Sequence, residues 1–198
     1  NAQSSYGPLR VPHPEAYPGG REYPMCWKDH QGYFWIYGGF NSIVGHYSET
    51  WRFDGTYWTF WGGSTGTNEV PPFYESPKTF SFDHHPGSRD STNAAVTASG
   101  TAVYIFGGHI SATFSSYTAD LWKFESDKGW AFWAGTIGFT EANPGIKRVS
   151  NETNKIGSTY HPMLVVDEFD NVWIFGGYSR NSQGYYSKSF YLNYYLSS

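Results

Sequence analysis

Charged residues are scarce in this chain of 198 residues. They make up 15% of the sequence and leave a formal net charge of −4. Because no run of lysine or arginine is present to neutralise phosphates, we expect no nucleic-acid partner. No apolar stretch approaches the roughly 20 residues of a membrane-spanning helix, so we expect no membrane insertion.

Cysteine occurs once, at Cys26, which excludes an internal disulfide framework. The chain begins at Asn1, without methionine and without the pattern of a signal peptide. We therefore expect a mature, processed or excerpted chain.

Alanine, leucine, glutamate and lysine, which favour helices, are also few. In contrast, aromatic residues make up 21% of the sequence, and there are 23 glycines. Tyrosine, tryptophan, phenylalanine, threonine and valine dominate the ordered-looking runs, and turn residues separate them. This composition predicts an all-β fold with almost no helix.

Two features favour secretion. The polar residues are mostly serine, threonine, asparagine and tyrosine rather than lysine and glutamate. The triplet "NET" makes Asn151 an N-glycosylation acceptor in a polar loop. We expect an extracellular or cell-surface protein that is glycosylated at Asn151.

A motif recurs three times. The stretches "YFWIYGGF", "AVYIFGGH" and "NVWIFGGY" end in the pairs Gly38–Gly39, Gly107–Gly108 and Gly176–Gly177, which are 69 residues apart. A proline and glycine followed by a basic residue precede each unit. Self-similarity at a fixed period is the signature of a repeat architecture.

Large aromatic residues keep the same period. They are Trp51, Trp122 and Phe190 after each glycine pair, then Trp58 and Trp130 seven or eight residues later. Each unit resolves into short strands joined by polar turns. The predicted strands are 22–28, 33–37, 50–53 and 58–61 in the first unit, 93–98, 102–106, 121–124 and 130–133 in the second, and 162–166, 172–175 and 189–192 in the third.

This pattern resembles the kelch motif of long-repeat kelch proteins. The resemblance implies β-propeller blades, each of four antiparallel strands, with the third blade incomplete. It divides the chain into 1–19 (a linker from a missing preceding blade), 20–64 (blade), 65–87 (linker), 88–136 (blade), 137–161 (linker with an insertion) and 162–198 (incomplete blade), all in one propeller domain.

The repeated residues have structural and functional interpretations. The glycine pairs suit close backbone approach and unusual dihedral angles, whereas a phosphate-binding loop would need a following helix. The tryptophans either stack on sugars or fill the layer between blades, where each buried aromatic contributes about 1.5–3 kcal/mol. Arg21 and Arg89 either hold backbone carbonyls or bind an anion. We favour the structural role for the glycines and tryptophans.

The units are longer than the roughly 50 residues usual for kelch repeats. We expect the extra length, including Phe80 and Phe82, to lie on one side of the sheets, where second strands connect to third strands. This is called the loop side below. Loops carry function more often than strands do. The candidate binding residues there are His46, Tyr47, His109, Tyr117, Arg180 and Tyr186.

Three units cannot enclose a channel, since propellers close with typically four to eight blades. Three explanations stay open. The chain is an excerpt of a longer polypeptide, which we favour, or two copies pair into a six-blade ring, or copies tile into a filament.

No catalytic constellation is recognisable. Some kelch propellers carry copper-radical oxidases, whose site needs two tyrosines, one of them cross-linked to a cysteine, and two histidines around the metal. Here Cys26 is the single cysteine, and no pair of histidines is tied to it by spacing. The nearest ligand-like group is Asp83, His84, His85 and Asp90. Adjacent imidazoles seldom chelate one ion without further ligands. We predict no catalytic residue, no metal and no cofactor.

The sequence thus favours a non-enzymatic kelch propeller that acts as a protein- or glycan-binding or assembly module. One alternative is a structural subunit of an extracellular fibre, in which neighbouring chains complete the blades. Another is a fragment of a carbohydrate-active or oxidase propeller.

Overall fold

The computed structural model describes residues 3–65, 69–110, 117–143, 146, 155–180, 186–188 and 192–193, with the backbone alone from residue 179 onward. Strands, turns and loops make up the described residues, which confirms the all-β prediction. In this part of the chain there is no helix that could span a membrane.

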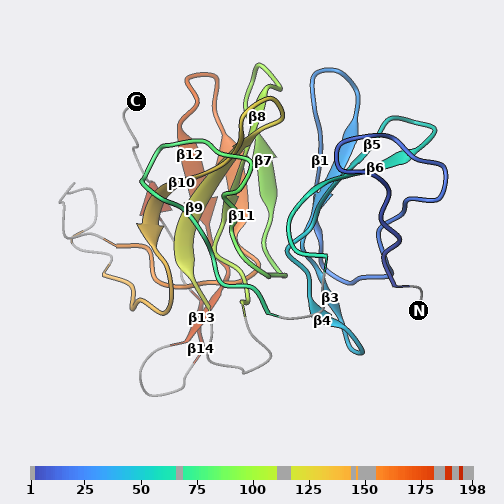
Figure 1. Ribbon diagram of the computed structural model, residues 1–198. Coiled ribbons are helices and arrows are strands. Elements are labelled where there is room, and N and C mark those ends of the chain that lie inside the picture. The colour runs from blue at the N-terminus through green and yellow to red at the C-terminus, as the bar shows by residue number, and fades with distance from the viewer. Residues whose placement is uncertain are drawn as a thin grey trace.

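Three antiparallel meander sheets follow one another along the chain (Figure 1). The first has the order β1-β2-β5-β6, the second β10-β9-β8-β7, and the third β11-β12-β15. Their strands are β1 (Met25–Lys28), β2 (Phe34–Tyr37), β5 (Thr50–Phe53), β6 (Trp58–Gly62), β7 (Ala94–Val96), β8 (Ala102–Phe106), β9 (Ala119–Glu125), β10 (Gly129–Thr136), β11 (Met163–Val166), β12 (Val172–Phe175) and β15 (Leu192–Asn193).

Two small hairpins lie at one end of the molecule, at the bottom of Figure 1. They are β3 (Phe40–Asn41) with β4 (Gly45–His46), and β13 (Tyr178–Arg180) with β14 (Tyr186–Lys188). Each follows the glycine pair of its unit, so this end is the loop side.

The opposite ends of the strands are closed by local polar turns. Asp29 Oδ1 accepts hydrogen bonds from the backbone N–H of Gln31 and Tyr33, and its Oδ2 accepts one from Trp35 Nε1 at 2.8 Å. Asp167 holds the third unit in the same way, with Trp173 Nε1 at 2.9 Å. The aspartate therefore fixes both the turn and the tryptophan six residues later.

The sheets stack through two apolar layers. In each sheet, the face that is directed toward the next unit is called the trailing face, and the opposite face the leading face. The trailing face of the first sheet packs on the leading face of the second, and the trailing face of the second packs on the third. The trailing-face residues are Met25, Trp27, Trp35 and Tyr37 in the first sheet, and Ala95, Tyr104 and Phe106 in the second.

The segment before each of the first two sheets packs on that sheet's leading face. Tyr6 stacks on Trp51 with ring centroids 5.6 Å apart. Tyr74 stacks on Phe132 at 4.4 Å and also contacts Trp122. The two tyrosines thus perform the same packing role in the two units.

The prediction that Phe80 and Phe82 lie on the loop side is wrong. Between them, Ser81 exchanges two backbone hydrogen bonds of 3.1 Å with Trp130, near the start of β10. That strand starts at the end of the sheet opposite the loop side, because it follows the β9–β10 hairpin. The linker of residues 65–87 therefore passes beside the outer strand β10 before the chain returns to the loop side at Arg89.

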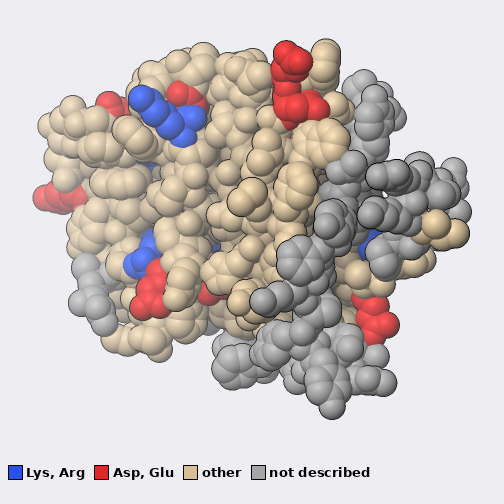
Figure 2. Space-filling view, turned by 180° about the vertical axis from the view of Figure 1, so that it is seen from behind, with Lys and Arg blue, Asp and Glu red and all other residues tan. Residues whose placement is uncertain are grey.

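Charged side chains are few and scattered on the face seen in Figure 2. Most of that face is uncharged, as the composition requires. The fold therefore depends mainly on aromatic layers, with a small number of buried ion pairs near the glycine turns.

Candidate functional site

The glycine pairs place the backbones of neighbouring units in direct contact. Gly38 and Gly107 have φ angles of +63° and +69°. A Cβ at Gly38 would lie 2.3 Å from the carbonyl oxygen of Arg89, and one at Gly107 would lie 2.4 Å from that of Thr159. Both the dihedral angle and the close approach require glycine, and neither involves a ligand.

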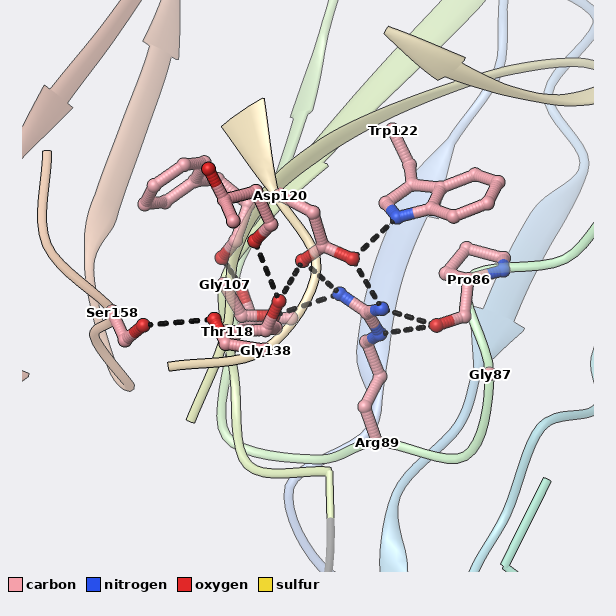
Figure 3. Close-up of polar contacts among 12 residues, drawn as sticks. Pro86, Gly87, Arg89, Gly107, Thr118, Asp120, Trp122, Gly138 and Ser158 are labelled. Atoms are coloured by element: carbon pink, nitrogen blue, oxygen red, sulfur yellow. Dashed lines mark hydrogen bonds and ion pairs between the residues drawn. The ribbon is translucent and has the colours of Figure 1, made fainter. Parts of the chain in front are cut away.

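A buried ion pair supports each of the first two turns. Arg89 donates to the carbonyl oxygen of Gly107 and forms a paired contact with the Asp120 carboxylate (Figure 3). The same carboxylate accepts a 2.7 Å hydrogen bond from Trp122 Nε1. In Figure 3 the guanidinium lies between Asp120 and the carbonyl of Pro86, so no side is open to an external anion.

The first unit repeats this arrangement. Arg21 donates to Gly38 O at 3.0 Å and to Glu49 Oε2 at 2.6 Å, and Trp51 Nε1 donates to the same carboxylate oxygen. Glu49 and Asp120 were missed by the sequence analysis. The signal that would have found them is an acidic residue two positions before Trp51 and Trp122, the equivalent tryptophans of the first two units.

The third unit lacks this arginine. Gly39 N–H donates to the carbonyl of Arg89, and Gly108 N–H donates to that of Thr159. Thr159 therefore occupies the position of Arg89. The basic residues Lys147 and Arg148, which follow Pro144 and Gly145 in the sequence pattern, lie outside the described residues.

A polar cluster lies on the loop side, directly beside these turns. His46 Nε2 is 3.1 Å from His109 Nδ1, and the two side chains come from different units. Asp90 completes the cluster, with Oδ2 3.7 Å from His46 Nε2 and Oδ1 3.6 Å from His109 Nδ1. Among the described residues, this is the one group of three or more His, Cys, Asp or Glu side chains with the geometry to hold a metal ion.

Local structure fixes all three side chains. His46 ends β4 and pairs with Phe40. Asp90 follows Arg89, whose carbonyl accepts from the glycine turn of the first unit. His109 follows the glycine pair of the second unit, and its backbone exchanges two 3.0 Å hydrogen bonds with Asp90. The cluster is thus built on backbone that is hydrogen-bonded at all three positions.

The cluster is buried, with a narrow exposure at His109. The His46 side chain is 1% exposed, that of Asp90 7%, and that of His109 19%. Burial lowers the pKa of His46, although the negative charge of Asp90 opposes this shift. Within the described part of the chain, His46 Nδ1, Asp90 Oδ1 and His109 Nε2 have no hydrogen-bond partner.

The next junction carries tyrosines at the same three positions. Tyr117, Tyr160 and Tyr178 take the places of His46, Asp90 and His109, as the matching backbone bridges show. Tyr160 stacks on Tyr117 at 4.8 Å and on Tyr178 at 5.4 Å. The fold therefore accepts an aromatic stack where the first junction has the polar cluster.

The other candidate binding residues are two buried tyrosines and two residues of the β13–β14 hairpin. Tyr47 and Tyr117 are 2% and 4% exposed, so both contribute to packing. Arg180 and Tyr186 pair with each other through the backbone of β13 and β14. The side chains of Arg180 and Tyr186 lie outside the described part, as do Phe190 and Asn151.

The repeated tryptophans lie in or beside the apolar layers. Trp51 and Trp122 are fully buried, and Trp130 is 3% exposed. Trp58 is partly buried and packs against the cluster around Trp51. These positions favour packing over sugar stacking for all four.

The ligand-like group of the first linker does not converge. His84 uses both ring nitrogens within the protein: Nδ1 contacts the carbonyl of Thr79 at 3.0 Å, and Nε2 accepts from Glu75 N–H. Asp90 instead faces His46 and His109. The sequence analysis thus named His46, His109 and Asp90 but did not group them.

A separate cavity of about 470 Å³ lies between the N-terminal segment and the start of β10. Aromatic side chains and one cation line much of it. The lining includes Arg10, Phe60, Trp61, Phe82 and Trp130.

Comparison with known proteins leaves the family open. No family model matches the sequence, and no curated protein matches it. Among solved structures, that of the protein YjhT is similar at 12% sequence identity and a TM-score of 0.36. The match covers 82% of this chain and spans 61% of the length of that chain. A likeness this distant supports no inference about the fold or the function.

Proposed function

We propose that this chain is a non-enzymatic, extracellular kelch-type β-propeller module that functions by binding and assembly. Its three sheets are blades, and its end faces bind further blades of the same type. The support for blades is the repeated meander with an equivalent glycine turn in each unit. The first strands β1, β7 and β11 also lie side by side, as the innermost strands of a propeller do.

The observation that carries the proposal is the trailing face of the third sheet. Register pairs Met163 with Phe175 and Val165 with Trp173, which makes this face equivalent to those that pack in the first two units. Here, however, Met163, Val165 and Phe175 are 60%, 46% and 42% exposed. A contiguous apolar face of this kind marks an interaction surface.

The leading face of the first sheet is the counterpart. Phe34 is 52% exposed, whereas Val103, at the equivalent position of the second sheet, is buried at 1%. The exposed parts of the two end faces, Phe34 on the first sheet and Val165 with its neighbours on the third, thus belong to the two kinds of face that meet inside the array. The N-terminal segment covers the outer strands of the first sheet, as the linker does in the second. A second copy of this chain, placed head to tail, recreates the internal junction. Two copies give six blades, within the range in which propellers close.

Sedimentation of the purified protein tests this proposal. The wild-type chain is expected to associate, and Val165→Lys to shift it toward monomer, because a lysine would be buried without a partner in the junction. Val165 is half-exposed in the single chain, so the fold should tolerate the change. Ile43→Lys, at a 73% exposed turn position, is the matched control.

The size of the associated species distinguishes a closed ring from a fibre. A defined dimer supports a closed ring, and a ladder of larger species supports the fibre arrangement through the same faces. A wild-type chain that stays monomeric at all concentrations would contradict the proposal. So would association that Val165→Lys and Ile43→Lys affect equally.

A second candidate function is glycan binding in the 470 Å³ cavity. Its size suits a small ligand, and Trp61 and Phe82 offer apolar ring surface beside the Arg10 guanidinium. Arg10 already lies 3.7 Å from the Phe82 ring centroid. Screening on a glycan array, with Arg10→Ala as the variant, tests this. Of the loop-side residues, His109, Arg180 and Tyr186 stay candidates for a protein partner. The side chains of His46, Tyr47 and Tyr117 are almost fully buried and are no longer candidates for such a contact.

A further inference from the structure

We infer that His46, Asp90 and His109 form a binding site for a divalent transition metal ion of the zinc class. The site does not depend on the proposed assembly, because all three ligands belong to one chain. It departs from the sequence-based expectation that the protein binds no metal.

The distances fit a single ion. Three ligands that each lie about 2.0–2.1 Å from a tetrahedral metal centre are about 3.4 Å from one another. The three observed separations are 3.1 Å between the ring nitrogens, and 3.7 and 3.6 Å from these nitrogens to the Asp90 oxygens. The observed separations bracket the expected value, so the three donors already have nearly the spacing that one ion requires.

The environment of His46 orients its free nitrogen toward the cluster. Its Nδ1 lies 3.7 Å from Glu69 Oε1, on the side away from Asp90. A carboxylate there favours the tautomer with the proton on Nδ1, which leaves the Nε2 lone pair directed at His109 and Asp90. Histidine ligands of metals typically donate their second ring N–H to an outer carboxylate, and Glu69 lies on the side of the ring suited to this role, although 3.7 Å is longer than a hydrogen bond.

Hydrogen bonds and ion pairs within the described residues do not fully compensate the polar atoms of this cluster. A hydrogen bond between two neutral imidazoles uses one proton and leaves the Asp90 charge without compensation. The Asp90 side chain is 7% exposed, and its Oδ1 has no hydrogen-bond partner among the described residues. A buried carboxylate needs a cation or several donors. A divalent ion supplies this charge and uses both imidazole lone pairs.

The repeat itself shows that the fold does not require these residues. At the next junction Tyr117, Tyr160 and Tyr178 fill the equivalent positions by stacking. In the first unit, Phe40 occupies the position of His109 and forms the same backbone bridge. The polar triad is therefore a departure confined to one junction.

The donor set selects the kind of ion. Two imidazoles and one carboxylate suit zinc and its first-row neighbours, whereas calcium and magnesium prefer oxygen ligands. Three protein ligands leave at least one coordination position for water or an incoming group. His109 is the most exposed member of the triad, with 19% of its side chain accessible to solvent.

Titration of the metal-free protein with Zn²⁺, in competition with a chromogenic chelator, tests the inference. We expect one ion per chain, and no displacement by excess Mg²⁺ or Ca²⁺. Two variants remove one ligand each, namely His109→Phe and His46→Tyr. Phe40 and Tyr117 stand at the equivalent positions of other units, so the fold should accept both side chains. Each should lower the affinity at least about 100-fold, since each removes a ligand.

Two further variants sharpen the test. Glu69→Gln should lower the affinity by about 10–100-fold, because an outer carboxylate positions the ligand without touching the metal. His30→Gln, at an exposed histidine far from the cluster in the fold, should leave it unchanged. If His46→Tyr or His109→Phe fails to fold, histidine-selective NMR of the wild-type protein replaces them. Zn²⁺ should then shift the ring signals of two histidines only.

The absence of saturable Zn²⁺ binding would overturn the inference. So would binding that persists in folded His109→Phe and His46→Tyr, or that His30→Gln abolishes. Zn²⁺ that perturbs all seven histidines equally in the NMR spectrum would overturn it as well.

Discussion

Arg89 and Asp120 form a fully buried, two-pronged ion pair, with Nη1 3.0 Å from Oδ1 and Nη2 2.9 Å from Oδ2. The backbone carbonyl of Arg89 contacts the glycine turn of the first unit, while its side chain holds the carbonyl of Gly107 in its own unit. One residue thus connects two units.

Asp120→Asn should lower the free energy of unfolding by about 3–5 kcal/mol, because it leaves the Arg89 charge buried without its partner. Chemical denaturation measures the change. The double variant Arg89→Met, Asp120→Leu should lose less than the single variant, since no charge is then stranded. A single variant within about 1 kcal/mol of wild type would contradict this view of the pair.

Gly107→Ala should destabilise the protein through two separate costs. The positive φ costs about 1–2 kcal/mol for any residue with a Cβ, and the clash with Thr159 O adds about 1–3 kcal/mol. Gly55→Ala is the control, because Gly55 has a φ of +99° but nothing within 4 Å of a Cβ. Equal losses in both variants would show that the close approach between units has no energetic weight.

Tyr117→Ala should cost about 3 kcal/mol of stability, since the ring is buried and stacked on Tyr160. Tyr57→Ala, at a 44% exposed position, should cost far less. Thermal unfolding of both variants provides the comparison. A Tyr117→Ala protein as stable as wild type would instead favour a role for Tyr117 in partner binding alone.

Stability should fall as the pH is lowered through the titration of His85. Burial lowers the pKa of His85 below its usual 6.5, and Arg89 and His84 act in the same direction. The unfolded chain therefore takes up this proton first, so the free energy of unfolding decreases below about pH 6.5. His85→Gln removes this proton uptake. Its stability relative to wild type should improve between about pH 7.5 and 5, whereas parallel curves would contradict the assignment.

Much of the fold could be predicted because its signals are local. β5, β8 and β12 begin and end at the predicted residues, since aromatic and β-branched runs between turn residues define them. The third unit is less regular. The structure places Thr159 in the position of Arg89, because the carbonyl of Thr159 accepts from Gly108 as that of Arg89 accepts from Gly39.

The polar cluster could not be predicted because it is not local. His46 and His109 are separated by 63 residues and belong to different units. Only the packing of the first sheet on the second brings them to Asp90. The sequence instead grouped Asp90 with His84 and His85 by proximity along the chain, and local hydrogen bonds of His84 remove it from any such site.

The mass of the native protein in solution tests the central claim most directly, namely that further blades cover the exposed end faces. The account predicts a particle well above the 22.4 kDa of this chain and any glycan at Asn151. Light scattering coupled to size exclusion gives this mass, and denaturing mass spectrometry shows whether the blades come from one polypeptide or from several copies. A native particle of 22.4 kDa plus glycan, monomeric at all concentrations, would contradict it.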